Sequence, residues 1–281
     1  MQLGIVSDFH LGGTRNSQWN NRQMQLRATE LAQAAIATLN AHALDAVVVT
    51  GDLTEDGHHE GNYLHQLLLA RELLETIRAP WYVVPGNHDR LLVQSGDFDR
   101  VFSKHVLDGY TRWNEFGVVG LREWLGAQGH TFFKLGAAQI DNVVSAVKSD
   151  VPEMLVLFSH FPLLSEERFG ELHGGRYPGH LEDGALLLEQ LAQRVQNRIV
   201  IFCGHMHWHC ITSDPRWIHC TTGGMIEYPM ELRLVSLEFP TLQIATLDGA
   251  ARELAAQSLL DADWVRGETR DREGTFLLSR S

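Results

Sequence analysis

The sequence has few cysteines and no long apolar run. Its three cysteines, Cys203, Cys210 and Cys220, form no CxxC pair and would leave one thiol over if two were joined. We expect reduced thiols in a reducing compartment, and not a disulfide framework. No stretch approaches the ~18 apolar residues that span a bilayer, so no membrane segment is predicted. A strand pattern begins already at Gln2, so we expect no leader peptide and a cytoplasmic location.

Basic residues are also scarce. Lys and Arg number 23 against 35 Asp and Glu, which gives a net charge of −12. Binding to extended nucleic acid needs basic patches that neutralise phosphates, so this charge balance argues against it. A short or single-stranded oligonucleotide is still possible as a substrate. The balance does not exclude a local positive site, because bound metal ions carry charge that a count of side chains omits.

Internal repeats, low-complexity segments and Pro/Ser-rich linkers are absent from the 281 residues. We therefore expect one domain over residues 1–250, with an insertion at about residues 90–130. A C-terminal extension of unassigned role follows over residues 251–281. The apolar content of 44% is enough for a substantial core. The oligomeric state is left open, a homodimer included.

The first ninety or so residues alternate apolar runs with amphipathic segments. Apolar runs at residues 3–7, 46–50 and 81–84 are typical of buried strands. Segments 21–40 and 62–78 have apolar residues spaced for one face of a helix. This β-α-β-α-β order predicts a parallel sheet covered by helices, which is an α/β fold.

The rest of the chain is less regular. Further strands are predicted at residues 131–135, 138–141, 154–159 and 198–203, and helices at residues 98–106, 118–125 and 184–195. Short strands follow at residues 217–221, 232–238 and 242–247. Their hairpin-like spacing indicates an antiparallel edge or a second sheet stacked on the first.

Five of the predicted strands end in side chains of the types that bind metals. These side chains are Asp8, His10, Asp52, Asn87, His88, Asp89, His160, His205 and His207. The carboxyl ends of parallel strands face one ligand crevice, so we expect them to meet. Each has an ordinary explanation as a turn or loop residue, but five such strand ends together are improbable by chance. Their donors are too many for one tetrahedral ion and suit two ions, with Mn, Fe or Zn favoured because no cysteine takes part.

The strand-end residues form five blocks in a fixed order. The blocks are Asp8-x-His10, Gly51-Asp52, Gly86-Asn87-His88-Asp89, His160 and Gly204-His205-x-His207. In this order they resemble the signature of the calcineurin-like metallophosphoesterase superfamily. The run from Gly51 to Gly57 is most similar to the bacterial class III cyclic-nucleotide phosphodiesterase branch. The resemblance implies a four-layer α-β-β-α sandwich of two mixed β-sheets flanked by helices.

The resemblance also implies a role for each block residue. The first metal ion would be bound by Asp8, His10 and His207, the second by Asn87, His160 and His205, and both by Asp52. A hydroxide bridging the two ions would be the nucleophile, so no phospho-enzyme is expected. His88 would protonate or stabilise the leaving oxygen, and Asp89 would orient His88 and keep it protonated.

The implied activity is metal-dependent hydrolysis of phosphoric esters. A small phosphodiester is the favoured substrate, with a cyclic nucleotide as the best single candidate. A phosphomonoesterase or protein phosphatase of the same superfamily uses the same ligands, and a nuclease also stays open. A non-catalytic scaffold, such as the retromer subunit that resembles these enzymes, is expected to have lost ligands, whereas all seven are present here.

Overall fold

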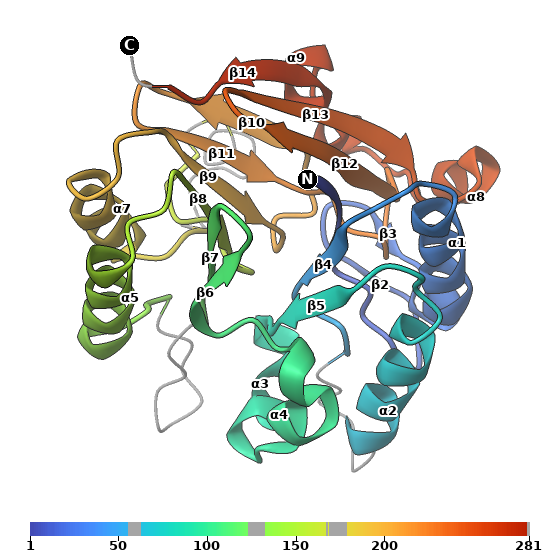
Figure 1. Ribbon diagram of the computed structural model, residues 1–281. Helices are drawn as coiled ribbons and strands as arrows, with labels where there is room; N and C mark the ends of the chain where they lie inside the picture. The colour runs from blue at the N-terminus through green and yellow to red at the C-terminus, as the bar shows by residue number, and fades with distance from the viewer. Residues whose placement is uncertain (56–62, 123–132, 167, 169–178, 280–281) are drawn as a thin grey trace.

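The computed structural model describes residues 1–55, 63–122, 133–166, 168 and 179–279. Two six-stranded sheets lie between two pairs of helices (Figure 1). The flanking helices are α1 (Ala28–Asn40) and α2 (Tyr63–Leu74) on one side, and α5 (Ala137–Ser149) and α7 (Gly184–Ala192) on the other. The predicted four-layer α-β-β-α sandwich is therefore confirmed.

Both sheets are mixed, as expected. The first has the order β14 (Gly274–Leu277), β13 (Thr241–Asp248), β12 (Glu231–Glu238), β1 (Gln2–Val6), β4 (Ala46–Thr50), β5 (Trp81–Val84). The second has the order β10 (Cys210–Ser213), β11 (Trp217–Thr221), β9 (Ile199–Cys203), β8 (Met154–Phe158), β7 (Phe116–Gly120), β6 (Gly109–Trp113). Strands β1, β4 and β5 are parallel in the first sheet, and β7, β8, β9 and β11 are parallel in the second.

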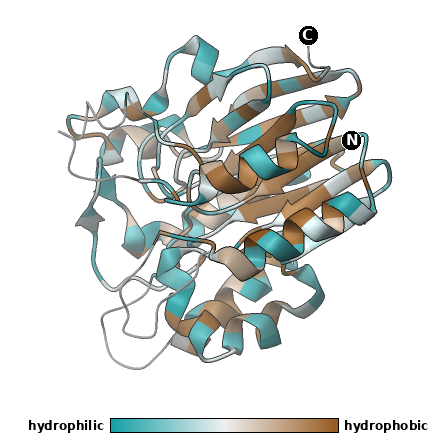
Figure 2. Cartoon of the chain, turned by 90° about the vertical axis from the view of Figure 1, so that its left-hand side faces the viewer, coloured by the Kyte–Doolittle hydropathy of each residue, from teal (hydrophilic) through white to brown (hydrophobic). Residues whose placement is uncertain are grey.

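Three apolar layers hold the sandwich together, because successive residues of a strand point to opposite faces. Val47 packs in the layer under α1 and α2, and its neighbour Val48 packs between the sheets. On the other side Leu155 packs in the layer under α5 and α7, while Val156 packs between the sheets. The central strands are therefore apolar on both faces, and they appear mostly brown in Figure 2, whereas the helices alternate brown and teal.

The insertion and the extension are both built into these layers. Residues in the insertion form α3 (Arg90–Gln94), α4 (Asp97–Phe102), the 3-10 helix η3 (Ser103–His105) and the edge hairpin β6–β7. The extension forms α8 (Arg252–Ser258), η4 (Asp263–Arg266), α9 (Thr269–Arg272) and the edge strand β14. Short elements near the strand ends complete the described fold: β2 (Ser17–Gln18), β3 (Arg22–Gln23), η1 (Gln25–Arg27) and η2 (Asn87–Asp89).

Three predicted elements between residues 116 and 141 differ from the described structure. The strand expected at residues 138–141 is part of helix α5, because apolar residues recur with a helical period over the longer span: Ile140, Val143, Val144 and Val147 are all buried. The helix expected at residues 118–125 begins within β7, which is buried on both faces between β6 and β8. Of the strand expected at 131–135, residues 133–135 are not a strand and the first two lie outside the described residues.

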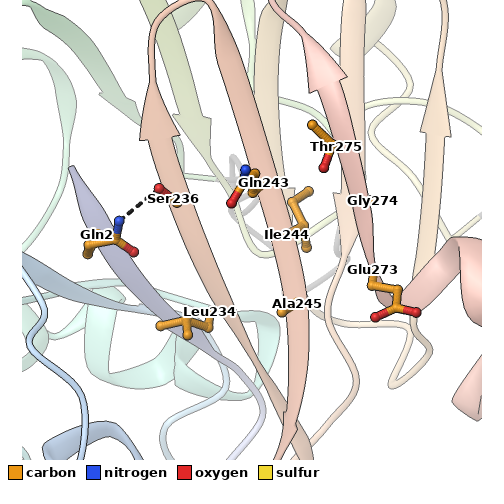
Figure 3. Close-up of a pocket in the computed structure, with 9 residues that line it drawn as sticks. All are labelled: Gln2, Leu234, Ser236, Gln243, Ile244, Ala245, Glu273, Gly274 and Thr275. Atoms are coloured by element: carbon orange, nitrogen blue, oxygen red, sulfur yellow. Dashed lines mark hydrogen bonds between the residues drawn. The ribbon is translucent and has the colours of Figure 1, made fainter.

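None of the helices in the described ranges is both long and apolar enough to cross a lipid bilayer. A concavity of about 590 Å³ lies on the part of the first sheet formed by β12, β13 and β14 (Figure 3). It is lined by Gln2, Leu234, Ser236, Gln243, Ile244, Ala245, Glu273, Gly274 and Thr275. Glu273 is the one ionisable side chain among them, so this concavity does not offer the donors of a metal centre.

Candidate active site

The predicted site residues follow β1, β4 and β5 of the first sheet and β8 and β9 of the second. The chain turns sharply after these strands, and five candidate ligands adopt a positive φ, between 47° and 69°. They are Asp8, His10, Asp52, His205 and His207. This left-handed backbone is unfavourable for residues other than glycine, at about 1–3 kcal/mol each. Five residues with this backbone conformation lie close together here, which indicates that the surrounding fold stabilises the turns that point these side chains inward.

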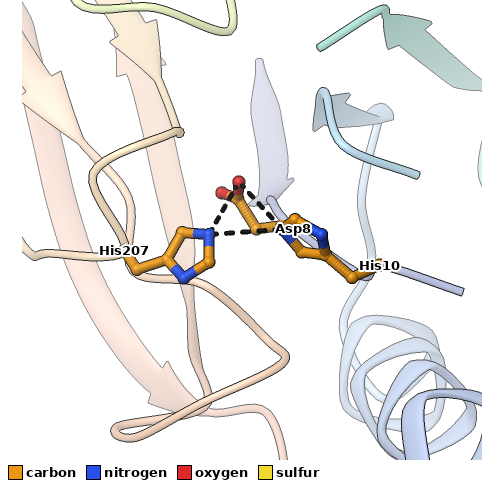
Figure 4. Close-up of side chains that lie close together, drawn as sticks. All are labelled: Asp8, His10 and His207. Atoms are coloured by element: carbon orange, nitrogen blue, oxygen red, sulfur yellow. Dashed lines mark hydrogen bonds and ion pairs between the residues drawn. The ribbon is translucent and has the colours of Figure 1, made fainter. Parts of the chain in front are cut away.

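One cluster joins Asp8, His10 and His207, which the sequence analysis assigned to the first metal ion (Figure 4). Asp8 Oδ1 lies 3.1 Å from His207 Nε2 and 3.9 Å from His10 Nε2. The two imidazole Nε2 atoms are 3.4 Å apart. All three side chains are buried. Three donor atoms therefore face one small volume.

A second cluster lies beside the first. It contains Asp52, His160 and His205, and Asn87 joins it because its Oδ1 is 3.0 Å from His160 Nε2. Asp52 Oδ2 lies 3.2 Å from His160 Nε2 and 3.6 Å from His10 Nε2. Asp52 is thus the side chain between the two clusters. The structure brings together all seven residues that the sequence analysis selected as ligands, in the same two groups.

Hydrogen bonds on the far side of the rings fix how three of the histidines face the clusters. His160 Nδ1 lies 2.8 Å from the carbonyl oxygen of Thr50, which only accepts, so Nδ1 carries a proton and the neutral ring has its lone pair on Nε2. His207 Nδ1 lies 2.7 Å from Glu227 Oε1, and His10 Nδ1 lies 2.9 Å from Glu55 Oε2. Such outer acceptors orient metal-binding imidazoles and fix their tautomer.

The donor set fits bound cations. Once His207 has lost its second proton and keeps the one on Nδ1, the Nε2 atoms of His10 and His207 present lone pairs toward each other and toward the Asp8 carboxylate. In the second cluster His160 Nε2 lies 3.0 Å from Asn87 Oδ1 and 3.2 Å from Asp52 Oδ2. Without metal, the proton on His207 supplies positive charge among these donors, and a bound cation would supply it instead. Neutral imidazoles, carboxylates and an amide oxygen together suit Mn, Fe or Zn.

The electrostatics keep most of these groups in the protonation state that metal binding requires. Burial opposes the charge of Asp52, but His160 and the neighbouring histidines hold the pKa of its carboxyl well below the usual range. Burial and the nearby His160 lower the pKa of His205, which keeps that ring neutral. Burial alone would lower the pKa of His207, yet Asp8 and Glu227 raise it to about 10. A metal ion at His207 must therefore displace a proton.

Two glycines allow the loops to approach this closely. Gly51 has φ +94°, and a Cβ on it would overlap the His160 ring. A Cβ on Gly86 would overlap the carboxylate and backbone nitrogen of Asp52. Both glycines belong to the blocks singled out in the sequence, and each leaves room for the candidate ligand beside it.

His88 lies at the rim of the clusters, and its ring is edge-on to that of His10 with centroids 4.6 Å apart. The contacts of Asp89 differ from the expected ones: its carboxylate accepts from the backbone N–H of Leu53, Thr54 and Gly86 at 3.0–3.2 Å. It also accepts from the Thr54 hydroxyl at 2.8 Å. Through these four hydrogen bonds, Asp89 joins the loop that follows β4 to the loop that follows β5. The carboxylate beside His88 is instead Glu55, with Oε1 3.4 Å from Nδ1.

A cavity of about 250 Å³ opens onto the clusters. Its lining includes His10, Asp52, Glu55, Asn87, His88, His205, His207 and four residues of the hairpin formed by β2 and β3. Glu55 stood in the quoted run from Gly51 to Gly57 and was overlooked. Glu227 and the hairpin follow no strand-end pattern, so no feature of the sequence marks them.

Comparisons with known proteins agree with this geometry. A family model described as calcineurin-like phosphoesterase matches residues 1–223. A probable glycerophosphodiester phosphodiesterase, GpdQ, of Arcobacter nitrofigilis is 24% identical over 166 residues, which are 58% of this chain and 56% of the relative. The chain thus spans little more than half the length of that relative.

Solved structures show the same fold at low sequence identity. A dimetal phosphatase from Danio rerio superposes with a TM-score of 0.70 at 13% identity, covering 100% of this chain and 99% of that one. The purple acid phosphatase PPD1 from yellow lupin (Lupinus luteus) gives a TM-score of 0.58 at 14% identity, over 98% of this chain and 53% of that one. At these identities the likeness concerns the fold.

Proposed function

The chain belongs to the calcineurin-like phosphoesterase family, and we propose that it is a dimetal phosphodiesterase that acts on small phosphodiesters. The observation that carries the proposal is the pair of buried clusters beside a cavity, with Asp52 of one cluster 3.6 Å from His10 of the other. Family membership supports hydrolysis of a phosphoester by a dinuclear metal centre. Beyond this, we propose a preference for diesters, the identity of the metals and the roles of single residues.

In this proposal the first ion is held by Asp8, His10 and His207, the second by Asn87, His160 and His205, and Asp52 bridges them. When bound, the two ions lower the pKa of a water molecule that they share and neutralise charge on the phosphate oxygens. The chain holds its carboxylates ionised and His205 neutral, as a ligand set needs. Mn, Fe and Zn all suit such donors.

His88 is proposed to donate a proton to the leaving oxygen. Its ring lines the cavity and its side chain is 29% exposed, so it can reach a substrate without being a buried ligand. Glu55 would stabilise the protonated ring from 3.4 Å away, in the role first assigned to Asp89. Burial raises the pKa of Glu55, but the hydrogen bond with His10 and the nearby His88 ring lower it by more, so the carboxylate is charged.

The charge of the cavity favours a diester over a monoester. A phosphomonoester carries up to two negative charges near neutral pH, and a diester carries one. Among the described residues, no Lys or Arg lines the cavity. A substrate with one negative charge is therefore the better match. The name of the distant Arcobacter nitrofigilis relative, a probable phosphodiesterase, points the same way. Within this class we propose a cyclic nucleotide as the first candidate and the cytoplasm as the location.

The test uses protein stripped of metal and reloaded with Mn²⁺. Hydrolysis of bis(p-nitrophenyl) phosphate is compared with hydrolysis of p-nitrophenyl phosphate, and a Zn²⁺-loaded sample controls for the choice of metal. We expect a higher kcat/KM for the diester. A higher kcat/KM for the monoester would move the assignment to a phosphomonoesterase. Inactivity on both esters, with two ions bound per chain, would refute the proposed activity on small phosphoesters.

A further inference from the structure

Two groups of side chains line the cavity. One group consists of candidate metal ligands together with His88 and Glu55. The other comes from the hairpin of residues 17–23 and consists of Ser17, Gln18, Trp19 and Gln23. A phosphate held at the clusters would therefore present its ester groups beside the hairpin.

The hairpin's contribution to the cavity is uncharged. Its four lining residues, Ser17, Gln18, Trp19 and Gln23, include an amide at Gln18 and an indole at Trp19, while the Ser17 hydroxyl already donates to Gln23 Oε1. These groups can stack on a substrate and form hydrogen bonds with it, but they cannot pair with a charge. The hairpin is therefore suited to a neutral substrate group with a flat face.

The hairpin cannot hold its own shape, because each of its strands has two residues and isolated hairpins are marginal in water. Two buried asparagines at its turn attach it to the metal-binding loops. Asn20 Nδ2 donates to the carbonyl oxygen of Met206, between His205 and His207, at 3.0 Å. The backbone N–H of Asn21 donates to Glu227 Oε2 at 2.7 Å, and the other oxygen of that carboxylate contacts His207.

The C-terminal extension supports the hairpin from behind. The side chain of Asn21 accepts from the N–H of Leu260 at 2.9 Å and donates to the carbonyl oxygen of Ala262 at 3.0 Å. Ser258 Oγ donates to the carbonyl oxygen of Arg22 at 2.6 Å. Trp19 is thus carried on a fixed support although its own surface is 37% exposed. Fixed, partly exposed aromatic rings provide large contact areas at low entropic cost.

We propose that Trp19 determines specificity by stacking on a flat, uncharged ring in the leaving group of the substrate, such as a nucleobase. Asn21 is the positioning residue that holds the hairpin for this contact. The inference rests on the proposed function, which supplies the phosphate site, and deepens it by naming the class of group beyond the phosphate. It also assigns a role to the C-terminal extension, as the support of the recognition hairpin.

The test measures binding and does not depend on turnover. AMP and ribose 5-phosphate share a sugar phosphate and differ in the base, so the ratio of their Kd values for Mn²⁺-loaded protein isolates the ring contact. We expect AMP to bind more tightly than ribose 5-phosphate. Trp19→Ala should raise the Kd of AMP by roughly 5- to 150-fold, the range for stacking of one base on one aromatic ring. The Kd of ribose 5-phosphate should not change. Trp19→Phe should keep most of the preference.

Bound Mn²⁺ and thermal stability are measured for each variant, with Leu277→Ala as a control that truncates an apolar residue 61% exposed on β14. Equal Kd values for the two ligands in the wild type would overturn the inference. So would a Trp19→Ala variant in which the Kd values of both ligands rise by the same factor. Asn21→Ala, which leaves the indole in place, should lower the AMP preference by a smaller factor. An unchanged preference there would overturn its positioning role. Inactivity on both nitrophenyl esters would refute the proposed function, whereas the base preference would still be measurable.

Discussion

Glu227 offers a sharp test of how the outer hydrogen bonds support the metal centre. It is fully buried, with Oε1 2.7 Å from His207 Nδ1 and Oε2 2.7 Å from the backbone nitrogen of Asn21. Both neighbours are donors when His207 presents its Nε2 lone pair. Glu227→Gln keeps the shape but has one acceptor oxygen, so its NH₂ group must face one of the two donors.

Either orientation of the new amide has a cost. If the NH₂ group faces the ring, His207 must move its proton to Nε2, which removes the ligand lone pair. If it faces Asn21, two hydrogen-bond donors meet in a buried position, which destabilises the protein by about 1–3 kcal/mol. Loss of such an outer partner lowers metal affinity by about 10- to 100-fold, or about 1.4–2.7 kcal/mol. We expect this loss at the cluster of Asp8, His10 and His207, with the other cluster little affected.

The assay is calorimetric titration of metal-free protein with Mn²⁺, fitted to two sites. Glu238→Gln, which changes an exposed carboxylate on β12, serves as the matched control. The wild type and the control should show the same two affinities, and Glu227→Gln should show one of them reduced. Unchanged affinity at both sites, with the variant folded, would refute the argument that Glu227 fixes the His207 tautomer.

Three further predictions follow from single residues. His88→Ala should keep both Mn²⁺ ions and slow kcat by roughly 10²–10⁴-fold, the usual scale of a general acid; loss of metal in elemental analysis would contradict its placement outside the ligand set. Gly51→Ala should lower the free energy of unfolding in urea by at least about 1–3 kcal/mol and weaken binding of the second ion, because φ is +94° and the Cβ meets His160; near-wild-type stability would contradict the close packing of this turn. Burial lowers the pKa of His219 to about 4, below the value of about 6.5 in the unfolded chain, so His219 alone should reduce the free energy of unfolding by about 3 kcal/mol as the pH drops from 6.5 towards 4. His219→Gln should lack this component of the fall, and parallel pH profiles of the two proteins would show that His219 is not buried neutral.

Much of the fold, and the meeting of the candidate ligands at one place, could be predicted from the sequence because the signal is local. Strands such as β4 and β9 are buried on both faces, so they appear as continuous apolar runs of five residues. A polar residue such as Asp52 directly after such a run is conspicuous. Because the topology carries these strand ends to one place, the pattern predicted the site without any knowledge of long-range contacts.

The parts that could not be predicted depend on contacts between distant segments. Residues 138–141 have the composition of a strand, but burial of the whole amphipathic span against the second sheet makes them helix. Glu227 matters because it meets His207, and nothing in its own neighbourhood marks it. Asp89 lies next to His88 in the chain, yet its oxygens are taken by the backbone of residues 53, 54 and 86, so adjacency in sequence predicted the wrong contact.

The central claim is that two metal ions act together in one centre that shares Asp52. Its most direct test is to titrate metal-free protein with Mn²⁺ and to measure bis(p-nitrophenyl) phosphate hydrolysis against the number of ions bound per chain. We predict little activity up to the first equivalent and a steep rise as the second equivalent binds. Full activity at one bound ion, or activity that persists in the metal-free protein, would contradict the account.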